Sequence, residues 1–240
     1  MKKVFASGSC RLLMSLKDGC NSIQLLHGMT HLFQGPNFLG KLHNIKQHIQ
    51  FIKFLKGELE LPQYILNGFL TSYRKGIDLP WCPYDDIQLI PQKINNIKEQ
   101  FNTCDTYIFE ICSLKLCRKD NYEVHLEHTK DYTLSIQTSE DLYNDIYELI
   151  KLIPPNKHII FQCHFRPNII YNDNTKTLDK REVIYNTIVK FINENKYTYP
   201  NINIYDPSTI TPEYFEDTDH FYEAGYTQSF VELHDLIYKD

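Results

Sequence analysis

The stretch VFASGSCRLL, residues 4–13, begins with an apolar run and ends in the leucines of an apolar helical pattern. Small residues and one thiol lie between the two parts, in the order Gly8, Ser9 and Cys10. This order is typical of a strand that turns directly into a helix. A cysteine at such a turn is either a nucleophile or a small apolar residue at a tight corner.

Three further apolar runs predict strands. DTYIFEICS (105–113) and KHIIFQCHF (157–165) have the nearly continuous hydrophobicity of strands that are buried on both faces, and NINIYDP (201–207) resembles a shorter last strand. Apolar residues at helical spacing separate these runs. The helices are expected at 10–18, 38–57, 86–102, 138–153, 179–195 and 222–239.

The alternation of strands and helices predicts an α/β fold, a three-layer α/β/α sandwich with a mostly parallel sheet. Its inner strands are expected at 2–7, 105–113 and 157–164. We predict one domain over 1–240 with a mostly helical insertion at about 28–104. Residues 21–28 predict a second short strand, and residues 121–137 alternate in a way that predicts a hairpin-like excursion.

Composition excludes several classes of protein. The formal net charge of −5 over 240 residues argues against a dedicated nucleic-acid-binding protein. The apolar runs are too short to span a bilayer, and the first residues lack the apolar region of a signal peptide, so we expect a cytoplasmic protein without a membrane partner. Seven cysteines without a CxxC pair argue against a disulfide framework and against a structural metal site.

Parallel strands place their carboxyl ends at one edge of the sheet, so the segments 7–11, 110–114, 162–166 and 206–221 are expected to converge there. The last of these contains EDTDHFYEAGY, in which Asp217 and His220 have D-x-x-H spacing. A carboxylate at this distance can orient the imidazole as a general base. We therefore predict Cys10 as nucleophile, His220 as base and Asp217 as the group that orients it.

The GSC turn together with a C-terminal D-x-x-H resembles the SGNH (GDSL) hydrolase superfamily. The resemblance is greatest to its GSCFA branch and to the cysteine-bearing acyltransferases of polysaccharide biosynthesis. It implies acyl transfer, with acetyl-CoA or another acyl-CoA as donor and a sugar or glycan hydroxyl as acceptor. The chain has no G-x-N-D block, so Ser113 or Glu110 is expected to replace its asparagine beside the amides of residues 9–11.

Oxyanion and substrate binding are assigned to six residues: Gly8, Ser9, Arg11, Ser113, His164 and Arg166. Arg11, His164 and Arg166 are expected to form a positive rim that suits the phosphates of an acyl-CoA or a nucleotide-sugar. Two alternatives remain open. One is an SGNH-type esterase or deacylase that uses water as acceptor, and the other is a non-catalytic module that binds a glycan or a nucleotide.

Overall fold

The computed structural model describes residues 2–16, 42–70, 90–125, 131–166, 175–216 and 220–238. Its main sheet has the strand order β1-β2-β6-β7, and every neighbouring pair is parallel. The strands are β1 (Val4–Ser7), β2 (Thr106–Ile111), β6 (His158–Cys163) and β7 (Ile202–Tyr205). The predicted α/β class with a parallel sheet is confirmed, whereas the short strand expected at 21–28 lies outside the described residues.

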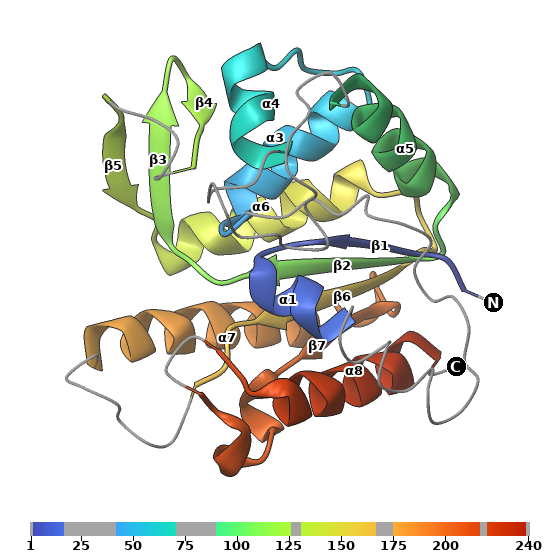
Figure 1. The fold of residues 1–240 in the computed structure, drawn as a ribbon, viewed down its shortest axis with the longest axis vertical. Coiled ribbons are helices and arrows are strands. Elements are labelled where there is room, and N and C mark those ends of the chain that lie inside the picture. Colours follow the sequence, from blue (N-terminus) through green and yellow to red (C-terminus); the bar gives the residue numbers. More distant parts are fainter. Residues whose placement is uncertain are drawn as a thin grey trace.

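Helices cover both faces of this sheet (Figure 1). One face carries the larger core, in which Phe5, Phe109 and Phe161 pack against helices of the middle of the chain. These helices are α3 (Ile45–Leu55), α4 (Gln63–Leu70), α5 (Ile90–Thr103), α6 (Ser139–Leu152) and α7 (Thr175–Asn195). On the other face, Ile108 and Ile160 pack against α1 (Cys10–Met14) and α8 (Glu223–Tyr238). The result is the three-layer arrangement expected from the sequence.

The predicted helical insertion at about 28–104 contains α3, α4 and α5 within its described part. Apolar residues of these helices, such as Phe51, Phe69 and Phe101, belong to the same core cluster as the strands. The segment therefore supplies part of a main layer. Among the described helices, none combines the length and the apolar character needed to cross a membrane.

The expected excursion after β2 is a small antiparallel sheet with the order β4-β3-β5. Its strands are β3 (Lys115–Lys119), β4 (Tyr122–Glu123) and β5 (Thr133–Ile136). Asp120 and Asn121 both have positive φ angles, as a tight hairpin turn between β3 and β4 requires. The sequence pattern indicated the excursion but missed its central strand, because β3 carries lysines and an arginine.

His48 fastens α3 to the carboxyl end of the sheet. Its Nδ1 lies 2.9 Å from Ser7 Oγ, and its Nε2 lies 2.8 Å from the backbone oxygen of Glu110. The carbonyl can only accept, so Nε2 carries the proton and Nδ1 accepts from the serine hydroxyl. Burial lowers the pKa of His48 to about 4, and the neutral ring thus joins β1, β2 and α3.

This shift predicts a pH-dependent stability. Between pH 6.5 and about pH 4 the unfolded chain binds a proton at His48 that the folded chain does not, so stability falls as the pH falls through this window. His48→Gln should remove on the order of 3 kcal/mol of this loss. Urea unfolding of wild type and variant at neutral pH and at about pH 4 measures it. His234→Gln, on α8, is the matched control, and equal pH slopes in wild type and His48→Gln would contradict the assignment.

Candidate active site

The turn from β1 into α1 is built as the sequence predicts. Ser9 is the N-cap of α1, and its side chain accepts a hydrogen bond of 3.3 Å from the amide of Arg11. Cys10 is the first residue of the helix, so its backbone lies at the carboxyl end of the parallel sheet. The side chain of Cys10 lies outside the described part of the structure.

Glu110 is the central polar group of this turn. It is completely buried near the end of β2, and its Oε2 accepts two hydrogen bonds of 2.6 Å from the amide and the hydroxyl of Ser9. Its Oε1 accepts from Arg11 Nε at 3.2 Å. Burial raises the pKa of Glu110, but the Arg11 guanidinium, the Ser9 hydrogen bonds and the charge of His164 together hold it below its usual range. The group is therefore an ionised buried carboxylate.

Gly8 allows Glu110 to approach the turn. A Cβ atom at this position would lie 2.6 Å from Glu110 Cβ and 2.9 Å from its Oε2. Glu110 Cβ is attached to the backbone of a central strand and cannot move aside at low cost. The glycine of the GSC motif thus has a steric reason in this fold.

The predicted oxyanion donors are engaged in building the site. The Ser9 amide donates to Glu110, and the Arg11 amide donates to Ser9 Oγ. Ser113 Oγ accepts a 3.0 Å hydrogen bond from the amide of Lys115, and the Ser113 amide donates to the carbonyl of His43. The amides of Ser9 and Arg11, which were expected to face a substrate oxyanion, thus donate to side-chain oxygen atoms of the protein itself in this structure.

The two arginines of the expected positive rim both lie against carboxylates. Arg166 donates through Nη1 to Glu182 Oε2 at 2.5 Å and through Nη2 to Asp206, and its guanidinium lies 3.7 Å from the ring centre of Tyr185. Arg11 lies against the carboxylate of Glu110. Each predicted phosphate-binding guanidinium is thus neutralised by carboxylates, which the sequence alone could not indicate.

His164 lies directly after β6 and is buried. It interacts electrostatically with the Glu110 carboxylate. Its Nδ1 is 3.1 Å from the carbonyl oxygen of Phe165, which can only accept, so Nδ1 carries a proton and Nε2 is the nitrogen left for proton transfer. The structure therefore places a second histidine, besides His220, at the same edge of the sheet as Cys10.

An aromatic cluster holds the C-terminal loop against this edge. Phe165 lies 4.9 Å from Phe215 and 4.5 Å from Phe221 between ring centres, and Met14 of α1 packs against the same cluster. Phe215 and Phe221 form a β-bridge across His220, whose carbonyl accepts from the amide of Glu216 at 3.0 Å. Phe215 and Phe221, which lie on either side of His220 in the sequence, thus belong to the cluster that Met14 of α1 contacts.

The predicted Cys10–His220 contact and the role of Asp217 stay predictions. Asp217 lies outside the described residues, as does the side chain of Cys10.

Two histidines near the turn had no assigned partner in the sequence. His48 binds Ser7 and the Glu110 carbonyl, as described above. His43 precedes α3, and burial together with the nearby Arg11 charge lowers its pKa to about 4. His43 lies 5.0 Å from His125 between ring centres. The one sequence signal for this polar cluster was a glutamate within the apolar run YIFEI.

Gly8→Ala tests the close approach at the turn. The added methyl group overlaps Glu110 Cβ, so the variant should lose about 1–3 kcal/mol of unfolding free energy. Urea unfolding measures the loss, with Gly57→Ala as a comparison at an uncrowded glycine of positive φ. A Gly8→Ala variant as stable as wild type would contradict the contact.

Glu110→Gln tests the buried carboxylate. The amide oxygen can still accept both Ser9 hydrogen bonds, but the NH2 group then faces the Arg11 Nε–H donor, and Arg11 loses its counter-charge, so a loss of about 3–5 kcal/mol is expected. The pKa of Glu110 is depressed, so its contribution is present above the usual carboxyl pKa and disappears as the pH falls through the folded value. The difference between wild type and variant should thus shrink in acid. Glu148→Gln, in an exposed ion pair with Lys53, is the control and should change stability by about 1 kcal/mol or less.

Comparison with known proteins gives few matches. No protein-family model matches the chain, and no curated protein sequence matches it. Among solved structures, the chain is similar to "The crystal structure of carbohydrate acetylesterase family member from Sinorhizobium meliloti". The TM-score is 0.40 and the identity 11%, over 99% of this chain and 97% of that chain.

Proposed function

We propose that the protein is an acyl-transfer enzyme of SGNH-like type in which Cys10 is the nucleophile. The observation that carries the proposal is the fixed backbone position of Cys10 between Ser9 and Arg11, both of which bind the buried carboxylate of Glu110. A nucleophile held in one place reacts faster, because its orientation is set before the substrate arrives. A corner residue with only a packing role would not require an ionised carboxylate beneath it.

In the proposed reaction, a histidine takes the proton of the Cys10 thiol, and the sulfur attacks the acyl carbonyl carbon. The bond to the leaving group breaks, and the leaving group receives the proton from the histidine. Water or a hydroxyl group then attacks the acyl-cysteine, and the thiol is restored. His220, oriented by Asp217, is our first candidate for the base, and His164 is the second.

Glu110 is a positioning residue in this proposal. It touches Ser9 and Arg11 and therefore fixes the turn that presents the thiol. Its carboxylate also interacts electrostatically with His164, which lies at the same edge of the sheet. A carboxylate near the imidazole favours the protonated ring, which in turn favours a thiolate in a cysteine–histidine pair.

The neutralised arginines favour an uncharged ester over an acyl-CoA. Arg11 and Arg166 both lie against carboxylates, so the described residues offer no built phosphate clamp at this edge. We therefore infer an esterase or deacylase first, with an O-acylated sugar as the substrate class that the sequence resemblance suggests. A transferase that uses acetyl-CoA is the second candidate, and a non-catalytic glycan or nucleotide binder is the third.

Intact-protein mass spectrometry tests the proposal. Wild-type protein is mixed separately with p-nitrophenyl acetate and with acetyl-CoA, and a single acetyl group is expected on Cys10 with the ester. Cys10→Ala should form no adduct and should not release nitrophenol. Cys112→Ala, which removes a half-buried thiol after β2, is the control and should behave as wild type.

Substituting His220 and His164 one at a time distinguishes the two candidates for the general base. The variant that removes the base should slow nitrophenol release by about 10²–10⁴-fold, whereas the other should change it far less. Faster acetylation by acetyl-CoA than by the ester would favour the transferase. Full activity in Cys10→Ala would overturn every enzymatic version and leave the binding module.

A further inference from the structure

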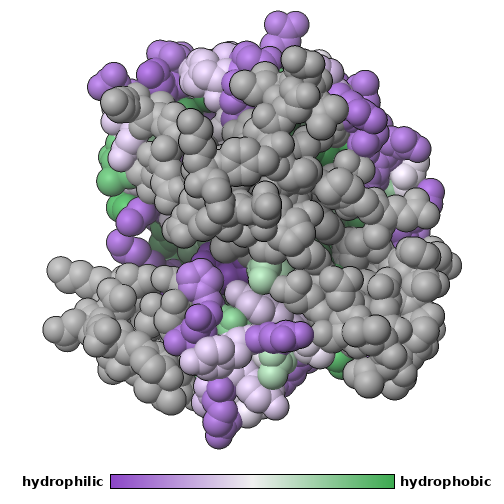
Figure 2. Space-filling model, viewed as in Figure 1, coloured by the Kyte–Doolittle hydropathy of each residue, from purple (hydrophilic) through white to green (hydrophobic). Residues whose placement is uncertain are grey.

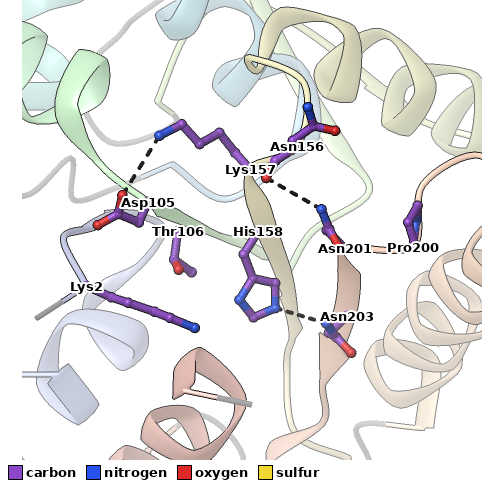
Figure 3. A pocket seen from close by; sticks show the side chains of 9 residues that line it. All are labelled: Lys2, Asp105, Thr106, Asn156, Lys157, His158, Pro200, Asn201 and Asn203. Carbon is purple, nitrogen blue, oxygen red and sulfur yellow. Dashed lines mark hydrogen bonds and ion pairs between the residues drawn. The ribbon is translucent and has the colours of Figure 1, made fainter. Parts of the chain in front are cut away.

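A polar cavity lies at the edge of the sheet opposite Cys10. Its volume is about 550 Å³, and residues at the amino ends of the four strands line it. Lys2 precedes β1, Thr106 and His158 begin β2 and β6, and Asn203 belongs to β7 (Figure 3). This cavity is separate from the candidate active site, which is formed where the same strands end.

The side chains on the α8 side of this cavity form a row across the strands. Thr106 and His158 are register partners, and Ile160, two residues after His158, pairs with Asn203. Ile108 and Ile160, next on the same face, pack in the cluster beneath α8. Lys2 Nζ donates a 2.8 Å hydrogen bond to the carbonyl of Ile237, so the end of α8 bounds the row.

The row offers hydrogen-bond donors. Asn203 Nδ2 lies 2.9 Å from His158 Nε2 and donates to it, so the imidazole proton is on Nδ1. Nδ1 has no partner among the described residues, and Figure 3 shows it on the side of Lys2 and Thr106. The hydroxyl of Thr106 is buried in the same wall and also lacks a hydrogen-bond partner within the described chain. Lys2 keeps ammonium protons beyond the one given to Ile237.

The other half of the cavity is neutral and rich in amides. Lys157 Nζ lies 3.9 Å from Asp105 Oδ1, and Asp105 Oδ2 accepts from the amide of Lys3, so this carboxylate is already engaged. Asn156 and Asn201 complete this half. Amide groups donate and accept hydrogen bonds, which suits hydroxyl groups.

We propose that this cavity is a binding site for a phosphate monoester of a sugar or polyol. The phosphate is held by Lys2 Nζ and the Nδ1–H of His158, while the hydroxylated body lies towards Asn156 and Asn201. An ammonium and an imidazole N–H beside each other favour an oxyanion over a cation. A cavity of about 550 Å³ is larger than a phosphate needs and has room for the attached body.

Isothermal titration of the full chain with glucose 6-phosphate, inorganic phosphate and glucose tests this site. Glucose 6-phosphate should bind saturably at millimolar concentration or below, phosphate should bind more weakly, and glucose should give no saturable heat. Lys2→Met and His158→Gln should each weaken glucose 6-phosphate binding by about tenfold or more. Lys190→Met removes an exposed lysine on α7 and is the matched control, and Cys10→Ala should bind as wild type, which separates this cavity from the turn.

Several results would overturn the proposal. The first is the absence of saturable glucose 6-phosphate binding, and the second is unchanged binding in both Lys2→Met and His158→Gln. The third is an equal loss of affinity in Lys190→Met, which would indicate a general charge effect. Equal affinity for glucose and glucose 6-phosphate would show that the cavity does not recognise the phosphate group. Equal affinity for inorganic phosphate and glucose 6-phosphate would show that it does not recognise the sugar. Circular dichroism of each variant confirms the fold, and both pocket substitutions lie at partly exposed positions, so folding is expected to persist.

Discussion

The carboxylate of Glu110 is ionised and has no exposure to solvent, and the structure around the first turn follows from that fact. A buried charge without partners costs several kcal/mol, so it must be surrounded by donors and opposite charge. Gly8 lets the backbone come close, Ser9 gives an amide and a hydroxyl, and Arg11 gives a positive charge. His48 binds the carbonyl of the same residue and attaches α3 to the arrangement.

These contacts join parts of the chain that are far apart in sequence. Glu110 is 99 residues from Arg11 and 62 residues from His48. The turn cannot shift without leaving a buried charge unpaired, so Cys10 has a fixed backbone position even though α1 has only five residues. Rigidity of this kind serves catalysis through orientation, and it uses the amide of Ser9 that a simple oxyanion hole would need. A substrate oxyanion in this site must therefore find donors other than that amide.

The fold could be predicted because buried parallel strands have an unmistakable local pattern. The apolar runs at 105–113 and 157–165 became β2 and β6, and the helix expected at 138–153 is α6, which Thr138 caps. The strand β3 was missed, since its lysines and arginine show no apolar alternation. The position of Cys10 was also predictable, because a strand-to-helix turn is encoded within ten residues.

The partners of the charged residues could not be predicted, because pairing depends on distant segments. Arg166 follows β6 and looked available for phosphate, yet it pairs with Glu182 on α7 and with Asp206 after β7. The glutamate in YIFEI was a usable signal, since a charge within a buried strand requires a compensating group somewhere in the fold. The sequence pattern alone does not identify Arg11 as the group that compensates the charge of Glu110.

The face of the sheet beneath α8 has the same polar–apolar–polar order along both central strands. On β2 the order is Thr106, Ile108 and Glu110, and on β6 it is His158, Ile160 and Gln162. Side chains on one face recur every second residue, so six-residue strands place three on this face, and only the middle ones lie under the apolar side of α8. The polar residues are thus left at both edges. At the carboxyl edge the Glu110 carboxylate accepts from Ser9 and Arg11, whereas at the amino edge the buried hydroxyl of Thr106 has no hydrogen-bond partner among the described residues. The same pleat therefore produces a closed polar cluster beneath Cys10 and an open, donor-rich cavity at the opposite end.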